Sequence, residues 1–139
     1  MRLFSFTAYC TPQPQGSSKA FVIGGRAHIT SANTKLKPFR SEVTRCALHE
    51  MALRGLPAPV FGKHVPVRIS VLFTLRRPDS VPKKRVHPVV KPDCDKLLRS
   101  LFDSMSGCVY HDDAQVCDIV TTKVYGPVEG VQITAEEMV

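Results

Sequence analysis

The sequence predicts one α+β domain, in which a mixed β-sheet is flanked by two main helices. The chain has 139 residues, a length that suits a single compact domain over residues 1–139. Hydrophobic residues make up 43% of it, which is enough for a modest core. Segments that alternate apolar and polar residues are interrupted by two segments with helical periodicity. Such a mixture of strands and helices is typical of an α+β fold.

The N-terminal part predicts strands joined by turns. Residues 2–9 alternate apolar and polar side chains, which is the pattern of a strand with one buried face. A polar loop rich in proline, glycine and serine follows over residues 11–19. Gly24 and Gly25 separate two β-forming runs, so we expect a hairpin over residues 21–30.

The first helix is expected after Pro38 and before Gly55. Proline suits the first turn of a helix, and glycine often follows its last residue. The apolar residues between them recur at helical spacing, which predicts one buried face. That face consists of Phe39, Val43, Ala47, Leu48 and Met51.

The second half predicts a helix between strands. Apolar residues recur at helical spacing between Asp93, which suits an N-cap, and Gly107, which suits the end of a helix. On either side, residues rich in Val, Ile and Thr favour strands. The expected elements are a central strand over residues 67–75, the helix over 93–107, a short strand over 108–110, a turn over 111–114, a strand over 115–125, an edge strand over 131–134 and a short acidic tail.

Residues 91–116, KPDCDKLLRSLFDSMSGCVYHDDAQV, form an acidic stretch on a basic chain. They hold five of the chain's 12 acidic residues, whereas the chain as a whole has a formal net charge of +7. Carboxylates that lie together need a counter-charge, and a divalent cation such as Mg²⁺ supplies one by binding oxygen ligands. The five are Asp93, Asp95, Asp103, Asp112 and Asp113.

The acidic stretch therefore predicts a metal site. A strand packed against the predicted helix could return Asp112 or Asp113 to the helix N-terminus, beside Asp93 and Asp95. Three or four carboxylates would then surround one point, as a hard cation requires. A transition-metal site formed by His111, Asp112 and a cysteine is an alternative.

Structural roles can also explain the same residues. Asp93 could serve only as an N-cap, and an Asp-Asp pair in a turn is usually just solvated. Asp95, Arg99 and Asp103 recur at intervals of four residues, so they line up along one side of the helix. They could form an ion-pair ladder on the surface, which would contribute little to stability.

Residues 76–91 form a basic loop directly before the acidic stretch. The loop has six Lys or Arg residues against one Asp, and three prolines prevent regular structure in it. A net charge of +7 implies an anionic partner, for which nucleic acid is the default. We expect this loop to contact DNA phosphates, although a solvated linker is the alternative. Its cations are Arg76, Arg77, Lys83, Lys84, Arg85 and Lys91.

The cysteines and the apolar runs indicate where the protein works. The five cysteines are odd in number and include no C-x-x-C pair, so neither a disulfide framework nor a zinc knuckle is predicted. This pattern fits a reducing cytoplasm. No apolar run reaches the length of a membrane span, and the N-terminus lacks the apolar core of a signal peptide.

The acidic stretch resembles the signature of the RusA family, the Holliday-junction resolvases of phages and prophages. That signature is K-P-D-x-D-x-L, then an aspartate and a glycine near the end of the helix, then D-D-x-Q-V. It corresponds here to residues 91–97, Asp103, Gly107 and residues 112–116. Residues 12–16, Pro-Gln-Pro-Gln-Gly, are similar to the family's N-terminal part, so the resemblance covers nearly the whole chain.

The resemblance implies roles for individual residues. In the family three aspartates bind the metal, and by position these are Asp93, Asp95 and Asp113, with Asp112 as a supporting residue. The family has a lysine one helical turn after its second aspartate, where this chain has Arg99. It usually has asparagine after that aspartate, where this chain has Lys96. Arginine keeps the charge but does not give up a proton, so position 99 would stabilise charge, with Lys96 as support.

The resemblance also implies an activity. It is Mg²⁺-dependent hydrolysis of phosphodiesters at four-way DNA junctions, with Mn²⁺ able to replace Mg²⁺. A homodimer would nick two strands symmetrically, in the cytoplasm of a bacterial host. Two alternatives stay open: a nuclease specific for flaps or other branched DNA, and a catalytically inactive DNA-binding protein.

Overall fold

The computed structural model describes residues 2–16, 18–31 and 33–139. It confirms an α+β fold with a mixed sheet and two helices. Its elements are β1 (Leu3–Ala8), β2 (Ser18–Ile23), β3 (Arg26–Ser31), α1 (Leu36–Arg54), β4 (Val67–Leu75), α2 (Cys94–Met105), the short 3₁₀ helix η1 (Asp113–Gln115), β5 (Val116–Tyr125) and β6 (Gly130–Glu137). Within the described part of the chain, no helix is both long and apolar enough to cross a membrane.

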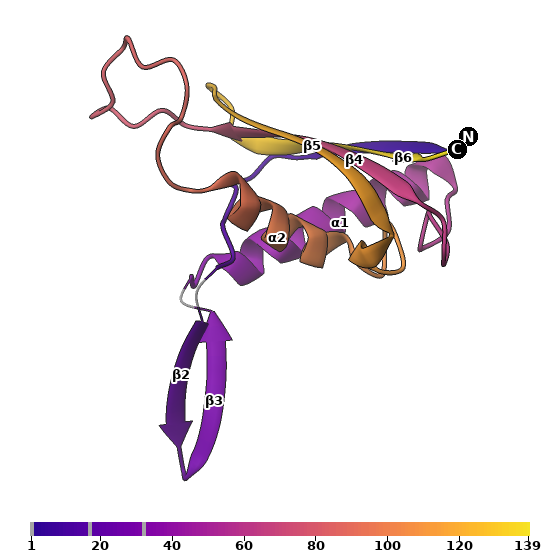
Figure 1. The fold of residues 1–139 in the computed structure, drawn as a ribbon, viewed down its shortest axis with the longest axis horizontal. Helices are drawn as coiled ribbons and strands as arrows, with labels where there is room; N and C mark the ends of the chain where they lie inside the picture. The colour runs from indigo at the N-terminus through magenta and orange to yellow at the C-terminus, as the bar shows by residue number, and fades with distance from the viewer. Residues whose placement is uncertain (1, 17, 32) are drawn as a thin grey trace.

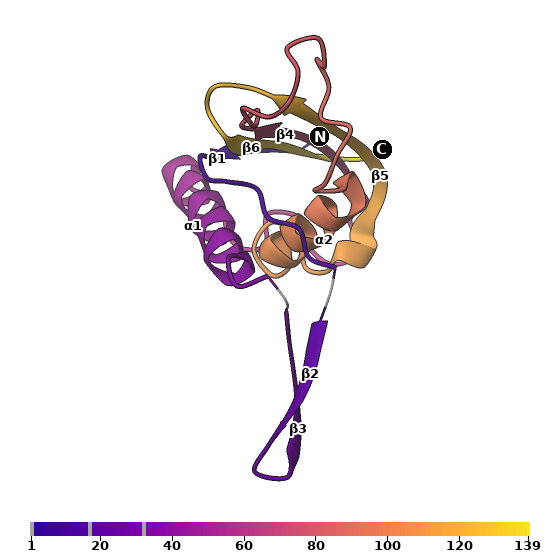
Figure 2. The same cartoon turned by 90° about the vertical axis from the view of Figure 1, so that its left-hand side faces the viewer.

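Four strands form the main sheet in the order β1-β6-β4-β5. β6 is antiparallel to both of its neighbours, whereas β4 and β5 are parallel. Both helices cover the same face of this sheet (Figures 1 and 2). Parallel neighbours need a crossover connection, and α2 together with the basic loop provides it between β4 and β5. This crossover decides where each end of α2 lies.

The core fills the space between the sheet and the two helices. Strand β4 alternates buried and half-buried residues along its whole length, as a strand with one covered face does. On α2, the small buried side chains of Ser100 and Ser104 lie where the two helices meet, and the Thr44 hydroxyl of α1 donates to the Ser104 carbonyl at 2.7 Å. Large fully buried side chains include Phe4, Ile69, Phe73, Leu97, Leu101 and Tyr110.

The predicted hairpin is confirmed as β2 and β3. Its two-residue turn consists of Gly24 at φ +57° and Gly25 at φ +76°, a conformation that other residues rarely adopt. The hairpin projects away from the sheet and helices as a separate arm (Figures 1 and 2). Val22 and Ile23 near its tip are exposed.

The first helix largely agrees with its prediction. It begins at Leu36, so Pro38 lies in the first turn, where a missing N–H costs no helical hydrogen bond. Gly55 closes the helix at φ +65°, as expected. The predicted buried face is confirmed except for Leu48, which is 44% exposed.

The predicted short strand over 108–110 and the predicted edge position of the last strand are wrong. Residues 107–109 form a turn, in which the Gly107 N–H donates to the Tyr110 carbonyl at 2.8 Å, and Tyr110 forms only isolated β-bridges, to Phe61 and Ser106. The last strand is longer than residues 131–134 and lies inside the sheet, between β1 and β4. Alternation of apolar residues identifies a strand with one buried face but does not say whether it has one neighbour or two. The acidic tail belongs to this strand, which extends to Glu137, and Glu136 accepts from Arg68 at 2.7 Å.

Candidate active site

Asp93 and Asp95 lie at the N-terminus of α2, where the basic loop ends (Figure 1). Asp93 is the N-cap residue, but its side chain accepts no capping hydrogen bond. The purely structural interpretation of Asp93 is therefore not supported, and its carboxylate is available to a ligand. The Lys96 ammonium lies 3.5 Å from the Asp93 carboxylate, and both side chains are nearly half exposed.

The basic loop is irregular, as predicted, and it is anchored at both ends. Near its start, the Arg77 guanidinium lies over the Tyr125 ring and donates to the Pro82 carbonyl. At its end, Lys123 of β5 donates to the carbonyls of Val90 and Pro92 at 2.8 and 2.9 Å. Between these anchors the side chains of residues 83–85 are exposed, and within the described residues they form no ion pair.

Asp112 and Gln115 have structural roles in η1. The Ala114 N–H donates to Asp112 Oδ1 at 3.0 Å, and the Asp112 N–H donates to Gln115 Oε1 at 2.9 Å, so the two residues form a capping box. The amide of Gln115 also donates to the carbonyls of Gly62 and Val65. These bonds give Asp112 and Gln115 structural roles, whereas Asp113 is not part of the capping box.

Asp113 lies beside the C-terminal half of α2, near Asp103. Partial burial, the hydrogen bond with Asp112 and the charges of Asp112 and Asp103 raise the pKa of Asp113. The hydrogen bond from the Ala114 N–H lowers the pKa of Asp112. The Asp103 carboxylate accepts from Gln15 Nε2 at 2.8 Å. Asp112 and Asp113 thus lie with Asp103 near the C-terminal end of α2.

The expected return of Asp112 or Asp113 to the N-terminus of α2 is wrong. Since β5 is parallel to β4, it must begin at the end of α2 that is remote from Asp93. Figure 1 shows η1 beyond the C-terminal end of α2, opposite the end where the basic loop enters. A helix of 12 residues is about 18 Å long, which is far beyond the reach of two carboxylates that share an ion.

Comparison with known proteins identifies the family. The family model described as endodeoxyribonuclease RusA matches residues 10–136 of this chain. The chain belongs to the RusA family. It is also 26% identical, over 99% of both chains, to a protein of Bacillus subtilis (strain 168) named "Uncharacterized protein YqaN". Membership implies an endodeoxyribonuclease of the kind that resolves Holliday junctions.

The RusA family implies a metal ion, and only some of the aspartates predicted to bind it lie together in this chain. Within the described residues, no three His, Cys, Asp or Glu side chains are placed to hold one ion. This holds for Asp93, Asp95 and Asp113, and also for a site that would combine His111 with Asp112 and a cysteine. The first two aspartates nevertheless suit Mg²⁺, which commonly binds one or two carboxylates together with water and substrate phosphate. Within the described residues, Asp113 is not placed beside them.

Arg99, which stands at the position of the family's lysine, is exposed on α2. Within the described part of the chain it forms no ion pair with Asp95 or Asp103. The side chain of Asp103 is bound by Gln15 instead. The ladder interpretation of Arg99 is therefore not supported, and its guanidinium stays available to an anionic substrate.

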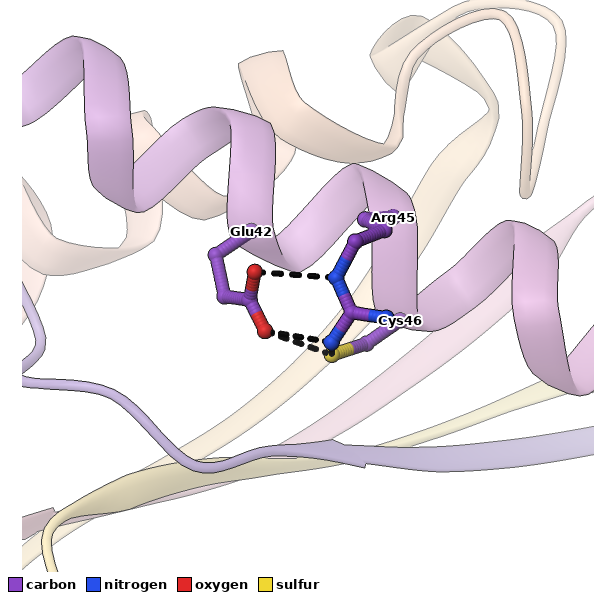
Figure 3. A network of polar contacts seen from close by, with 3 residues as sticks. All are labelled: Glu42, Arg45 and Cys46. Carbon is purple, nitrogen blue, oxygen red and sulfur yellow. Dashed lines mark hydrogen bonds and ion pairs between the residues drawn. The ribbon is translucent and has the colours of Figure 1, made fainter.

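A polar cluster on α1, far from these residues in sequence, consists of Glu42, Arg45 and Cys46 (Figure 3). Arg45 donates to both carboxylate oxygens of Glu42, at 2.6 and 3.0 Å, and the Cys46 thiol donates to one of them at 3.5 Å. Burial raises the pKa of Cys46, and burial together with the Glu42 charge raises the pKa of Cys10 to about 11. Protonated thiols are poor nucleophiles, so this cluster offers no cysteine chemistry.

Sequence reasoning missed Lys123. Its neighbours two positions away, Thr121 and Tyr125, pair with buried β4 residues, so Lys123 points toward α2 and not toward the open face of the sheet. Its two hydrogen bonds hold the backbone just before Asp93. A lysine at an inward position of a strand was the available signal, because an unpaired ammonium is seldom placed toward a core.

Proposed function

We propose that this RusA-family chain is a Mg²⁺-dependent endonuclease that nicks four-way DNA junctions symmetrically as a homodimer, in the bacterial cytoplasm, and that Mn²⁺ can replace Mg²⁺. The observation that supports it most is the uncapped Asp93 carboxylate, exposed with Asp95 between a basic loop and a helix N-terminus. Carboxylates in this setting suit a hard cation that also binds a DNA phosphate.

The residues around Asp93 and Asp95 would have different roles in the reaction. Asp93 and Asp95 would hold the ion, which activates water and neutralises charge on the scissile phosphate. Arg99, one helical turn beyond Asp95, would stabilise the negative charge that develops during cleavage. Lys96 lies next to Asp93 and supports the same charge. Lys123 keeps the backbone before Asp93 in place.

A homodimer would also explain the position of Asp113. Two-fold symmetry brings a surface of one subunit against the same surface of its partner, so opposite ends of two α2 helices can meet. In that arrangement the Asp93–Asp95 pair of one subunit would receive Asp113 of the partner subunit. Two such combined sites per dimer suit a junction, in which two strands must be cut.

The function is tested by incubating the protein with a synthetic four-way junction and Mg²⁺ and mapping nicks on each strand. We expect paired nicks at symmetric positions, no nicks in EDTA, and little cleavage of linear duplex. Faster cleavage of flaps or three-way branches would assign a different nuclease specificity. Tight junction binding without nicks in Mg²⁺ or Mn²⁺ would instead identify an inactive DNA-binding protein.

The basic loop is expected to bind phosphates without regard to DNA shape. Replacing Lys83, Lys84 and Arg85 by glutamine should weaken binding to junctions and duplexes alike, because these exposed cations have no ion pair within the described residues. The slope of log affinity against log salt should fall by about 2.7, since each lost phosphate contact contributes about 0.9. Fluorescence anisotropy at several salt concentrations measures this slope.

The control for this experiment neutralises cations that already have partners. Arg45 pairs with Glu42 and Arg54 pairs with Glu50 on α1. Replacing both arginines by glutamine should leave the salt dependence nearly unchanged. If the loop variant keeps the wild-type slope, the loop is a solvated linker and the phosphate-clamp assignment is wrong.

A further inference from the structure

Both ends of the basic loop are held by one strand, β5. At the start of the loop, the Arg77 guanidinium lies 5.8 Å from the centre of the Tyr125 ring. At its end, the Lys123 ammonium donates to the carbonyls of Val90 and Pro92 at 2.8 and 2.9 Å. Lys123 and Tyr125 are two positions apart on the strand, so their side chains lie on the same face. These two contacts form the neck of the loop.

The second neck contact depends on Lys123 alone. Within the described residues, no other hydrogen bond joins residues 90–92 to the rest of the chain. A lysine ammonium has three N–H donors, and Lys123 uses two of them on the loop backbone. Over the same described ranges, Lys123 forms no ion pair with a carboxylate. Its contribution is therefore to hold the end of the loop against β5.

Arg77 joins the neck to the turn that carries the exposed cations. Lys83 and Lys84 are the central residues of this turn, which the Arg85 N–H closes by donating to the Pro82 carbonyl at 2.9 Å. The Arg77 side chain donates to the same carbonyl, while its guanidinium lies over the aromatic ring of the neck. Arg77 thus supports the turn, in contrast to the three exposed cations, whose charges are directed to solvent.

We propose that Lys123 and Tyr125 are positioning residues that hold the basic loop closed, so that Lys83, Lys84 and Arg85 meet DNA phosphates as a preformed set. The inference rests on the proposed phosphate binding by this loop and assigns residues outside it that set its strength. If the neck opens, the apparent affinity falls to the fraction of molecules in which the loop is closed. The number of phosphates neutralised stays the same, so the salt dependence does not change.

The test measures binding of a four-way junction and of a linear duplex in EDTA, by fluorescence anisotropy at several salt concentrations. Lys123→Met removes both bonds and should weaken binding to both DNAs by about ten-fold, the effect of a hydrogen bond from a charged group. Tyr125→Leu should weaken it by about three-fold, the effect of an exposed cation–π contact. The slope of log affinity against log salt should change by much less than about 0.9, the value of one phosphate contact.

Conservative variants separate positioning from general damage to the sheet. Lys123→Arg keeps a charged donor and should recover most of the affinity. Tyr125→Phe should bind like the wild type, because the Tyr125 hydroxyl has no hydrogen-bond partner in the described part of the chain. Arg77→Lys keeps the charge but loses the planar group that stacks, so it should weaken binding at an unchanged slope. Thr122→Val, at the exposed position beside Lys123, is the matched control and should bind normally.

Three outcomes overturn the inference. The first is a slope that falls by about 0.9 in Lys123→Met, since its ammonium would then contact a phosphate itself. The second is wild-type affinity in both Lys123→Met and Tyr125→Leu; if Tyr125→Leu does not fold, wild-type affinity in Arg77→Lys counts in its place. The third is a wild-type slope in the loop variant of residues 83–85, which removes the phosphate clamp as well. A wild type that binds DNA but cuts no junction refutes only the proposed nuclease activity, and the binding comparison still decides the role of the neck.

Discussion

Two inactive variants should restore cleavage when they are combined. Asp95→Asn and Asp113→Asn are each expected to abolish nicking of a four-way junction. Asp95 and Asp113 lie at opposite ends of α2, so a mixed dimer would contain one intact combination of the two, contributed by different subunits. With random mixing, half of the dimers are mixed and one of their two sites is intact, so about a quarter of the wild-type activity should return.

The measurement is single-turnover cleavage after the two proteins are refolded together or co-expressed. Each single variant should still bind the junction, because asparagine removes a charge and leaves the basic loop intact. Binding in EDTA should be at least as tight as that of the wild type, since metal-free carboxylates repel DNA. Asp79→Asn, which removes the only acidic residue of the basic loop, is the matched control and should cut normally.

The results separate three arrangements of the site. If both single variants are inactive and the mixture stays inactive, the aspartates act within one chain and the partner does not supply Asp113. If one single variant cuts at the wild-type rate, that residue does not belong to the site. If the mixture alone is active, the site spans two subunits.

Periodicity predicted most of the fold because burial in this chain is regular. The alternation along β4 and the apolar face of α2 are visible in the sequence, and the structure confirms both. The position of β6 inside the sheet was not predictable in this way, because β6 and the edge strand β1 show the same alternation of buried residues. Strand order depends on long-range pairing, which no local pattern records.

The sequence supplied the candidate site residues, whereas their arrangement in space came only from the structure. Spacing alone did not distinguish an antiparallel return of the strand after α2 from a parallel one, and the parallel one places Asp113 at the other end of the helix. The motif also did not show that Asp112 and Gln115 serve as caps. The inward position of Lys123 in its strand was visible in the sequence, but its role was not, because its partners are backbone carbonyls about thirty residues away in the chain.

Arg99→Ala should lose about 100-fold in cleavage rate while junction binding stays intact. Removing one group that stabilises developing charge typically costs about 100- to 1,000-fold in rate. Arg99→Lys should retain much of the activity, because an ammonium also supplies a positive charge one turn from Asp95. Single-turnover cleavage and thermal unfolding of both variants are measured together.

Stability separates this catalytic role from a structural one. Arg99 has no ion pair with Asp95 or Asp103 within the described residues, so Arg99→Ala should hardly change the unfolding temperature. Arg45→Ala breaks a surface ion pair and should leave cleavage unchanged, which makes it the control. Full activity in Arg99→Ala would contradict the assignment. The charge would then have to come from Lys96, whose ammonium already lies 3.5 Å from the Asp93 carboxylate, and Lys96→Met would become the variant that loses cleavage.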